Sequence, residues 1–266
     1  MPELNIAFSS CPNDTFIFHA MLHQCVETGS LRFTPYISDV EELNRKAFSE
    51  TFHITKLSFY AYLHLKTRYD LLDSGSALGY GCGPMLVAKS PPKSWADAKI
   101  AIPGEYTTAH LLLKLWRPEI RHTEAVRFDY ILPGVASGKY DAGLIIHEGR
   151  FVYPEYNCIK IVDLGEWWEA ETRLPIPLGC IAIRRDPRTI QYKRDLESVL
   201  RASVAYAFEN PDASAEFVKS HAKELEKTVI NDHIQLYVND FTVSLGETGM
   251  KAIQKLEEMA ACRKIL

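Results

Sequence analysis

A strand-to-helix junction is predicted for Leu4-Asn5-Ile6-Ala7-Phe8-Ser9-Ser10-Cys11-Pro12-Asn13-Asp14-Thr15, where an apolar strand precedes an apolar helix that begins near Phe16. Small polar residues fill the turn between them. Such a turn presents unpaired backbone N–H groups and the positive end of the helix dipole, which suits a carboxylate or another anionic group. We expect a ligand to contact this turn, and the candidate lining residues are Cys11, Asn13 and Asp14.

The same construction occurs twice more along the chain. A second strand is predicted for His53-Ile54-Thr55-Lys56-Leu57, and Ser58 is a candidate N-cap of the helix that follows over residues 59–65. A third strand, residues 99–103, leads into a helix through Gly104-Glu105-Tyr106-Thr107-Thr108. Because ligands collect outside the carboxyl ends of strands in open α/β sheets, we expect the three junctions to line one crevice. Taken singly, each junction is more typical of an ordinary helix cap.

The composition indicates a stable core and no general affinity for nucleic acid. With 266 residues, 47% of them hydrophobic, the chain can bury roughly 70–75% of the surface that its unfolded form exposes. The formal net charge of −4 creates no positive field, so we expect no nucleic-acid partner.

No segment predicts export or membrane insertion. Met1-Pro2-Glu3-Leu4-Asn5-Ile6 lacks the basic and apolar regions of a secretory signal, and no stretch approaches the ~20 apolar residues of a membrane span. We therefore expect a cytoplasmic location and no membrane partner. The six cysteines include no Cys-x-x-Cys pair, which fits reduced thiols better than disulfides or zinc.

Strand-like and helical segments alternate along the chain, which is typical of an α/β fold built on mainly parallel sheets. Residues 84–89 and 180–185 resemble each other, because each is an apolar strand that turns basic and soon meets a proline. If the chain changes lobes at these strands, residues 1–88 and 182–266 form lobe one and residues 89–181 form an inserted lobe two. The two strands would then be a hinge, with a ligand cleft between the lobes. Beyond residue 190 the pattern becomes helical, and we expect these helices to wrap lobe one.

Two motifs that could indicate a cofactor or a metal are incomplete. In Gly79-Tyr80-Gly81-Cys82-Gly83-Pro84, proline replaces the third glycine of a dinucleotide-binding turn, and a strand follows where a helix is needed. His19 and His23 are one helical turn apart, but the pattern lacks the glutamate of a zinc protease and has no evident third ligand. We expect neither a cofactor nor a metal.

His147 is the strongest candidate for a catalytic residue. It follows Asp141-Ala142-Gly143-Leu144-Ile145-Ile146, a predicted buried strand, at the carboxyl end where crevices form. An imidazole with an ordinary pKa near ~6.5 accepts a proton at neutral pH without large retuning. The alternative is a histidine that only forms hydrogen bonds in a turn.

Cys11 and several aromatic residues are weaker candidates. The helix dipole could activate the Cys11 thiol, but no base partner can be assigned from the sequence, so a packed thiol is favoured. An aromatic wall for a planar substrate could form from Trp167 and Trp168 with Tyr106 or Tyr153, although such residues more often pack in a core.

Five segments, spread in order over nearly the whole chain, match the pattern of one known family. They are Ser9-Ser10-Cys11-Pro12-Asn13-Asp14-Thr15-Phe16-Ile17-Phe18, Thr55-Lys56-Leu57-Ser58, Gly104-Glu105-Tyr106-Thr107-Thr108-Ala109, Gly143-Leu144-Ile145-Ile146-His147-Glu148 and Leu174-Pro175-Ile176-Pro177-Leu178-Gly179. Together they resemble the 1,4-dihydroxy-6-naphthoate synthases, enzymes of the futalosine route to menaquinone. One departure is Ser10, where the family has proline, and it touches none of the assigned chemistry.

The resemblance implies a fold similar to the type II periplasmic binding proteins, with two α/β lobes joined by two crossing strands. It also implies a lyase reaction, the cleavage of cyclic dehypoxanthine futalosine to 1,4-dihydroxy-6-naphthoate with release of the sugar-derived fragment. The residue that matches the family's proton acceptor is His147. The residues that match its substrate-binding positions are Lys56, Leu57, Ser58, Thr107 and Thr108.

Two alternative functions remain open at this point. Chorismate dehydratase of the same pathway would share the fold and the compartment. A solute-binding protein would close on a small molecule without any chemistry, because fold does not determine function. A homodimer is compatible with the sequence as well.

Overall fold

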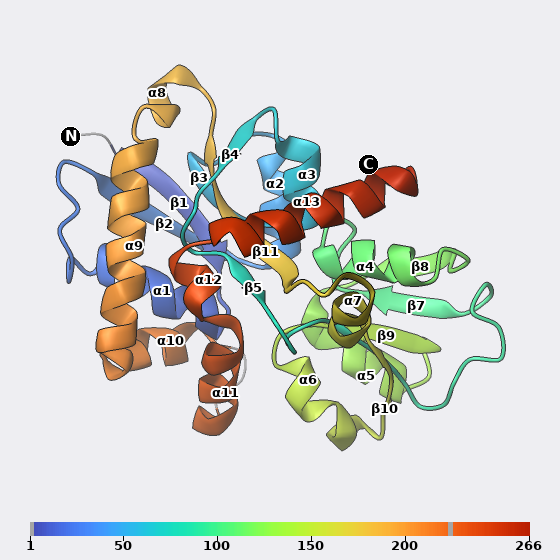
Figure 1. Ribbon diagram of the computed structural model, residues 1–266. Helices are drawn as coiled ribbons and strands as arrows, with labels where there is room; N and C mark the ends of the chain where they lie inside the picture. The colour runs from blue at the N-terminus through green and yellow to red at the C-terminus, as the bar shows by residue number, and fades with distance from the viewer. Residues whose placement is uncertain (1–2, 223–225) are drawn as a thin grey trace.

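The computed structural model describes residues 3–222 and 226–266 and contains two β-sheets flanked by helices. Figure 1 shows the two sheets in separate lobes that lie side by side. The strands of lobe one are β1 (Glu3–Ser9), β2 (Arg32–Ser38), β3 (Ile54–Ser58), β4 (Tyr69–Leu71), β5 (Ala77–Gly79) and β11 (Ile176–Arg184). The strands of lobe two are β6 (Met85–Ala88), β7 (Lys99–Ile102), β8 (His122–Ala125), β9 (Ala142–Ile145) and β10 (Ile159–Asp163).

The helices follow the same division. Those around the first sheet are α1 (Pro12–Leu22), α2 (Val40–Ala47), α3 (Phe59–Leu65), α8 (Pro187–Ile190), α9 (Lys193–Glu209), α10 (Ala215–His221), α11 (Lys227–Tyr237), α12 (Asp240–Val243) and α13 (Gly246–Cys262). Those around the second sheet are α4 (Thr108–Trp116), α5 (Ile131–Ala136), α6 (Gly149–Val152) and α7 (Leu164–Thr172). Short 3₁₀ turns are η1 (Phe128–Tyr130), η2 (Tyr153–Tyr156) and η3 (Pro211–Ser214).

Both sheets are mixed, whereas the sequence predicted mainly parallel ones. In lobe one β2, β1 and β3 are parallel neighbours, but β11 runs antiparallel to β3, β4 and β5. In lobe two β8, β7 and β9 are parallel neighbours, and β6 runs antiparallel between β9 and β10. Parallel neighbours need a crossover, and here a helix follows β1, β2, β3 and β7. The α/β fold class is confirmed.

The crossings between the lobes lie earlier in the chain than predicted. β6 pairs with β9 and β10, so residues 85–88 belong to the second sheet and not to lobe one. Residues 176–181 belong to β11 of the first sheet and not to lobe two. The crossing segments are instead β5 and the start of β11, which pair antiparallel through Gly79 with Ile176 and Ala77 with Gly179. The predicted hinge strands are apolar because both are buried inside their sheets.

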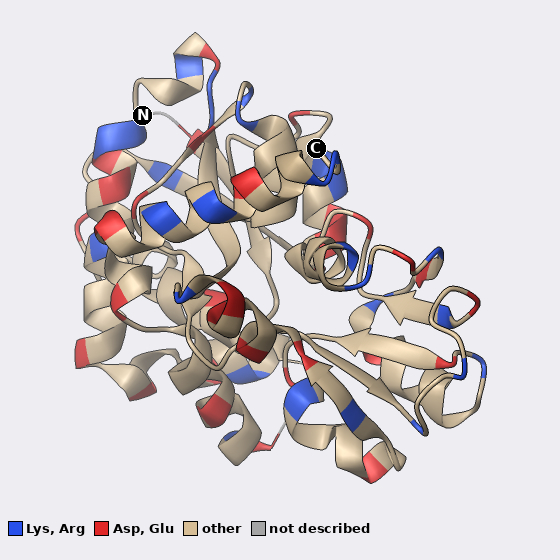
Figure 2. Ribbon diagram, turned by 45° about the vertical axis from the view of Figure 1, so that its right-hand side comes forward, with Lys and Arg blue, Asp and Glu red and all other residues tan. Residues whose placement is uncertain are grey.

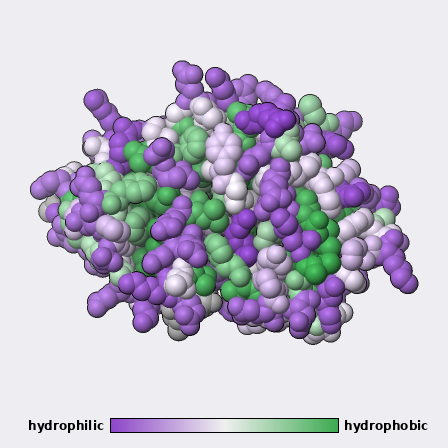
Figure 3. Space-filling view, turned by 60° about the horizontal axis from the view of Figure 1, so that its bottom comes forward, coloured by the Kyte–Doolittle hydropathy of each residue, from purple (hydrophilic) through white to green (hydrophobic). Residues whose placement is uncertain are grey.

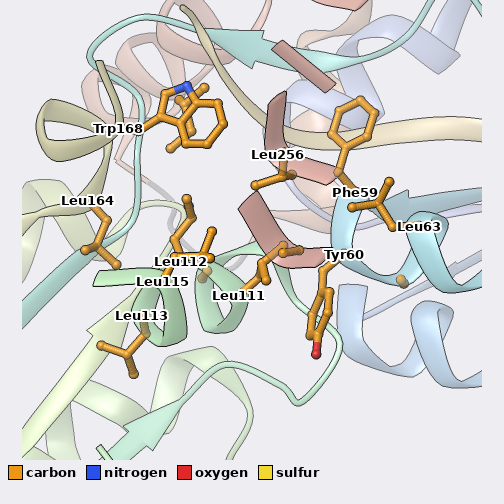
Figure 4. Close-up of a cluster of buried hydrophobic side chains, with 14 of the residues drawn as sticks. Phe59, Tyr60, Leu63, Leu111, Leu112, Leu113, Leu115, Leu164, Trp168 and Leu256 are labelled. Atoms are coloured by element: carbon orange, nitrogen blue, oxygen red, sulfur yellow. The ribbon is translucent and has the colours of Figure 1, made fainter. Parts of the chain in front are cut away.

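A continuous apolar core joins the lobes beside the crossing strands (Figure 4). From lobe one, Phe59 and Tyr60 on α3 and Leu256 on α13 belong to this cluster. From lobe two, Leu111 on α4 and Trp168 on α7 belong to the same buried cluster. The lobes therefore share hydrophobic packing in addition to the two connecting strands.

The C-terminal helices wrap lobe one only in part. As expected, α9, α10 and α11 pack on α1. The last helix, α13, contacts both β11 and α4, and Figure 1 shows it running from lobe one toward lobe two. This helix contributes to the interlobe core because Leu256 and Ala260 are fully buried.

The surface carries charges of both signs. Figure 2 shows Lys and Arg interspersed with Asp and Glu over both lobes. On the face in Figure 3, apolar atoms occur in separate groups among hydrophilic ones. Within residues 3–222 and 226–266, no helix combines the length and apolarity that crossing a bilayer requires.

Candidate active site

A cavity with an empty volume of about 630 Å³ lies where the lobes meet, and all three predicted junctions line it. The crossing strand β11 contributes Leu178 and Gly179 to its wall. The lining residues from the junctions are Ser9, Asn13 and Asp14, then Lys56 and Ser58, and finally Thr107 and Thr108. The expectation that the three junctions share one crevice is confirmed.

Asp14 is the centre of the charged part of the cavity wall. Its buried carboxylate accepts hydrogen bonds from Ser9 Oγ at 2.7 Å, Ser9 N at 3.1 Å and Asn13 Nδ2 at 2.8 Å. Lys56 Nζ, also buried, lies 2.6 Å from Asp14 Oδ1 and forms an ion pair with it. A buried ion pair is tolerated when both charges are compensated and the remaining lone pairs are bonded. The ammonium of Lys56 has further N–H donors for a ligand in the cavity that it lines.

Cys11 lies at the start of α1 and touches His147 across the lobe boundary. Its Sγ is 3.3 Å from His147 Nδ1 and 3.4 Å from Nε2. Burial raises the pKa of the Cys11 thiol well above its usual value, and the carboxylates of Glu148 and Asp14 raise it further. Because a reactive cysteine needs its thiolate, Cys11 is a neutral packed thiol and not a poised nucleophile.

His147 lines the cavity directly after β9. Its φ of +55° is in the left-handed region, which is uncommon for a residue other than glycine and here marks the turn that presents the ring. Part of the residue keeps contact with solvent, yet burial of the imidazole lowers its pKa to about 4, while Asp14 acts to raise this pKa and Lys56 to lower it. The ring is therefore neutral at pH 7 and can accept a proton.

A second histidine, His233 on α11, stacks on His147. The ring centroids are 5.9 Å apart and the planes differ by 27°. Asn13 fixes the His233 tautomer: Asn13 Nδ2 donates to the Asp14 carboxylate, so Asn13 Oδ1 faces His233 Nε2 at 3.0 Å and accepts a hydrogen bond from its N–H group. Within the described part of the chain, His233 Nδ1 has no hydrogen-bond partner. Burial, followed by the neighbouring His147, lowers the pKa of His233 well below its usual value, so this ring is neutral too.

Ser58 precedes α3 at the N-cap position, but its side chain does not cap the helix. Asn44 on α2 holds it instead: Ser58 N donates to Asn44 Oδ1 at 2.9 Å, and Asn44 Nδ2 donates to Ser58 Oγ at 3.0 Å. Because the hydroxyl oxygen accepts in this pair, its own hydrogen is available to a ligand in the cavity.

The two threonines at the start of α4 have different roles. Thr107 caps the helix, since its Oγ1 accepts from His110 N at 3.3 Å and donates to Gly104 O at 2.9 Å. Thr108 ties this helix to lobe one: its Oγ1 donates to Leu178 O at 2.7 Å and accepts from Tyr60 N at 3.3 Å. Both residues line the cavity from the side of lobe two.

Four predicted site residues are not among those that line the cavity, and one of them is Cys11, which packs against His147 instead. Leu57 is fully buried and packs in the large core. Tyr106 packs on Phe48, with ring centroids 4.5 Å apart. Trp167 lies on α7 beside a different surface groove, which it shares with Leu115. The aromatic wall considered for Trp167 and Trp168 with Tyr106 or Tyr153 does not line this cavity, and the packing that the sequence analysis favoured for such rings is what Tyr106 shows.

A family model described as "Menaquinone biosynthesis" matches residues 4–262. The chain belongs to this family. Two curated relatives in the menaquinone biosynthesis family carry the name 1,4-dihydroxy-6-naphthoate synthase. The protein from Thermus thermophilus is 45% identical over 263 residues, which cover 99% of this chain and 96% of the relative. The protein from Streptomyces coelicolor is 39% identical over 268 residues, which cover 99% and 94%.

Solved structures resemble the chain over its full length. A protein from Archaeoglobus fulgidus has a TM-score of 0.93 and 38% identity, covering 99% of this chain and 98% of its own. A Candida albicans protein described as having the generic periplasmic binding protein fold has a TM-score of 0.73 and 11% identity, covering 98% and 91%. The alkanesulfonate-binding protein of Xanthomonas axonopodis has a TM-score of 0.72 and 15% identity, covering 99% and 94%. The two distant likenesses show the fold alone, and the expected periplasmic-binding-protein fold is confirmed.

In this member of the menaquinone biosynthesis family, the sequence did not indicate three residues of the site. His233 and Tyr237 come from α11, and Asn44 comes from α2. The i, i+4 spacing of His233 and Tyr237 was the available signal, because it places both rings on one helix face, where their centroids are 4.6 Å apart. Asn44 had no such signal.

Proposed function

We propose that this protein is a lyase that cleaves cyclic dehypoxanthine futalosine to 1,4-dihydroxy-6-naphthoate and a sugar-derived fragment. One observation carries the proposal: His147 lines a cavity built from the three junctions, in a chain 45% identical to a 1,4-dihydroxy-6-naphthoate synthase. The substrate is a small molecule, and a cytoplasmic location suits such a biosynthetic step.

His147 acts as the general base in the proposed reaction. Its imidazole accepts a proton from the substrate, and the electron pair left on the substrate drives the breaking of a carbon–carbon bond in retro-aldol fashion. Formation of the aromatic naphthalene system favours the product. Burial keeps the ring in the form that accepts a proton, and by lowering the pKa of His147 to about 4 it also makes the imidazole a weaker base than an exposed one. Two neighbours hold the His147 ring in place. Phe128 packs against it in a T-shaped arrangement, with 5.0 Å between the two ring centroids, and the Cys11 thiol touches it.

The surrounding groups are suited to hold an anionic, hydroxyl-rich molecule. Lys56 brings a positive charge to the cavity, and the first turn of α4 after Thr107 offers the positive end of a helix dipole. Ser58 has a hydroxyl hydrogen to donate from the opposite side. Contact between the lobes around the bound molecule would fix its orientation and exclude water.

The decisive experiment is incubation of the purified protein with cyclic dehypoxanthine futalosine, followed by mass spectrometry. We expect 1,4-dihydroxy-6-naphthoate and the sugar-derived fragment to form in equal amounts over many turnovers. Binding without conversion would replace the proposal by a solute-binding role. Chorismate is tested alongside, and its dehydration in place of the futalosine reaction would assign the protein to the other activity of the pathway.

A further inference from the structure

A carboxylate of lobe one is bound by the backbone of lobe two next to the cavity. Glu41 lies on α2 and is 8% exposed. Its Oε1 accepts from Glu105 N at 2.9 Å, and its Oε2 accepts from Tyr106 N at 3.1 Å. Both donors belong to the loop that leads into α4 through Thr107 and Thr108. The contact thus joins α2 directly to the lobe-two arm of the cavity.

The same carboxylate is connected to the lobe-one arm. Asn44 Nδ2 lies 3.5 Å from Glu41 Oε2, and Asn44 is the residue that holds Ser58. Arg45 Nε lies 3.1 Å from Glu41 Oε1 and supplies a countercharge from the same helix. Glu41 therefore stands between Ser58 on one side of the cavity and the threonine turn on the other.

Gly104 shows how closely the two lobes approach at this point. A Cβ at this position would lie 2.4 Å from the carboxyl carbon and from Oε2 of Glu41, closer than any real Cβ contact. Only a residue without a side chain lets the loop reach the carboxylate. The steric fit and the paired hydrogen bonds are independent features of one contact.

We propose that Glu41 is a positioning residue that latches the two lobes together and sets Thr107 and Thr108 opposite Ser58. When the lobes separate for a ligand to enter or leave, the carboxylate releases both N–H groups. When they close, the two charge-assisted hydrogen bonds reform and restore the geometry of the cavity. The effect on catalysis rests on the proposed function, whereas the effect on lobe closure does not.

The test compares Glu41→Gln with Glu42→Gln. Glutamine keeps one acceptor but turns an NH₂ group toward a backbone N–H, so the pair of hydrogen bonds is lost. Glu42 is the matched control, because it is the next residue on α2 and, among the described residues, its carboxylate contacts Tyr36, Ser38 and Lys46 of lobe one. Small-angle X-ray scattering of the ligand-free proteins should show a larger radius of gyration for Glu41→Gln than for wild type and Glu42→Gln.

Kinetics give a readout that a merely structural role would not move. If Glu41→Gln lowers the fraction of molecules with the lobes latched to about a tenth, the apparent affinity for substrate falls about ten-fold. KM should then rise about ten-fold, with a smaller change in kcat. Gly104→Ala should raise KM more in the wild-type background than in a Glu41→Ala background, because only the strain of its backbone φ of +159° remains once the clash partner is gone.

Unchanged scattering and unchanged KM in Glu41→Gln would overturn the latch, and so would equal effects of Gly104→Ala in both backgrounds. If Glu41→Gln or Gly104→Ala folds poorly, the scattering and the KM of the other variant still test the latch. If wild type has no futalosine-cleaving activity, the proposed reaction fails, while the scattering comparison continues to test the latch by itself.

Discussion

The two walls of the cavity differ in their electrostatics. The wall from lobe one holds a buried ion pair, Asp14 with Lys56, whose charges are compensated by surrounding hydrogen bonds. The wall from lobe two presents neutral groups, the imidazole of His147 and the hydroxyls of Thr107 and Thr108. One lobe thus supplies fixed charge and the other supplies the proposed base. The difference teaches that neither lobe forms the cavity alone, since both supply its lining residues.

The largest expected effect comes from breaking the charged wall. Lys56→Met leaves the Asp14 carboxylate buried without its countercharge, which should lower the free energy of unfolding by about 3–5 kcal/mol. Urea denaturation measures the loss. The double variant Asp14→Asn with Lys56→Met should recover much of it, because no uncompensated charge remains. A loss below about 1 kcal/mol in the single variant would contradict a structural role of the pair.

Replacing the base of the neutral wall should abolish most activity and spare the fold. His147→Asn should lower turnover at least ~100-fold, as expected when a general base is lost. Steady-state kinetics measure the change, and circular dichroism checks the fold. The matched control is His122→Asn, an exposed histidine of the same lobe. Near-normal turnover in His147→Asn would remove this residue from the mechanism.

The pH dependence of kcat/KM should report on the neutral wall through His147. Because the pKa of His147 is lowered to about 4, kcat/KM should stay level on acidification to about pH 5 and then fall with a limb near 4. An acid limb near ~6.5, the ordinary value for histidine, would show that the base is not buried as described.

The free energy of unfolding should fall on acidification, as kcat/KM does. Between about 4 and ~6.5 the unfolded state binds more protons than the folded state, since the folded pKa of His147 is the lower one. The free energy of unfolding therefore decreases as pH falls through this window. His147→Asn should show a shallower decrease in urea titrations at several pH values, and an equal slope in both proteins would contradict the shifted pKa.

The smallest effect is expected where the two walls meet at the surface. Arg45 and Glu105 form an ion pair across the lobes at 3.1 Å, but their side chains are 53% and 56% exposed. Solvent screening limits such a pair to at most about 1 kcal/mol. Glu105→Gln should thus change KM by less than a factor of about five. A ten-fold rise in the KM of Glu105→Gln would show that the exposed ion pair, and not the buried Glu41 alone, holds the two lobes together.

Local patterns predicted much of the site. The turns after β1 and β3 and before α4 were recognised because small polar residues interrupt apolar runs, and all three reach the cavity. His147 was recognised from its place after a buried strand. Tyr106 and Trp167 were misplaced because a helix or loop position does not say which neighbour will cover a ring. The hinge was misplaced because an apolar strand looks alike in either sheet.

The sequence by itself determined the α/β alternation and the three polar turns, since both depend on neighbours along the chain. Only the tertiary structure decided which groups meet. The pairing of Lys56 with Asp14, the stacking of His233 on His147 and the binding of Glu41 by the loop before α4 join distant segments. Such contacts, and the lowered pKa values that burial produces, depend on how the sheets and helices pack, which periodicity along a chain does not encode.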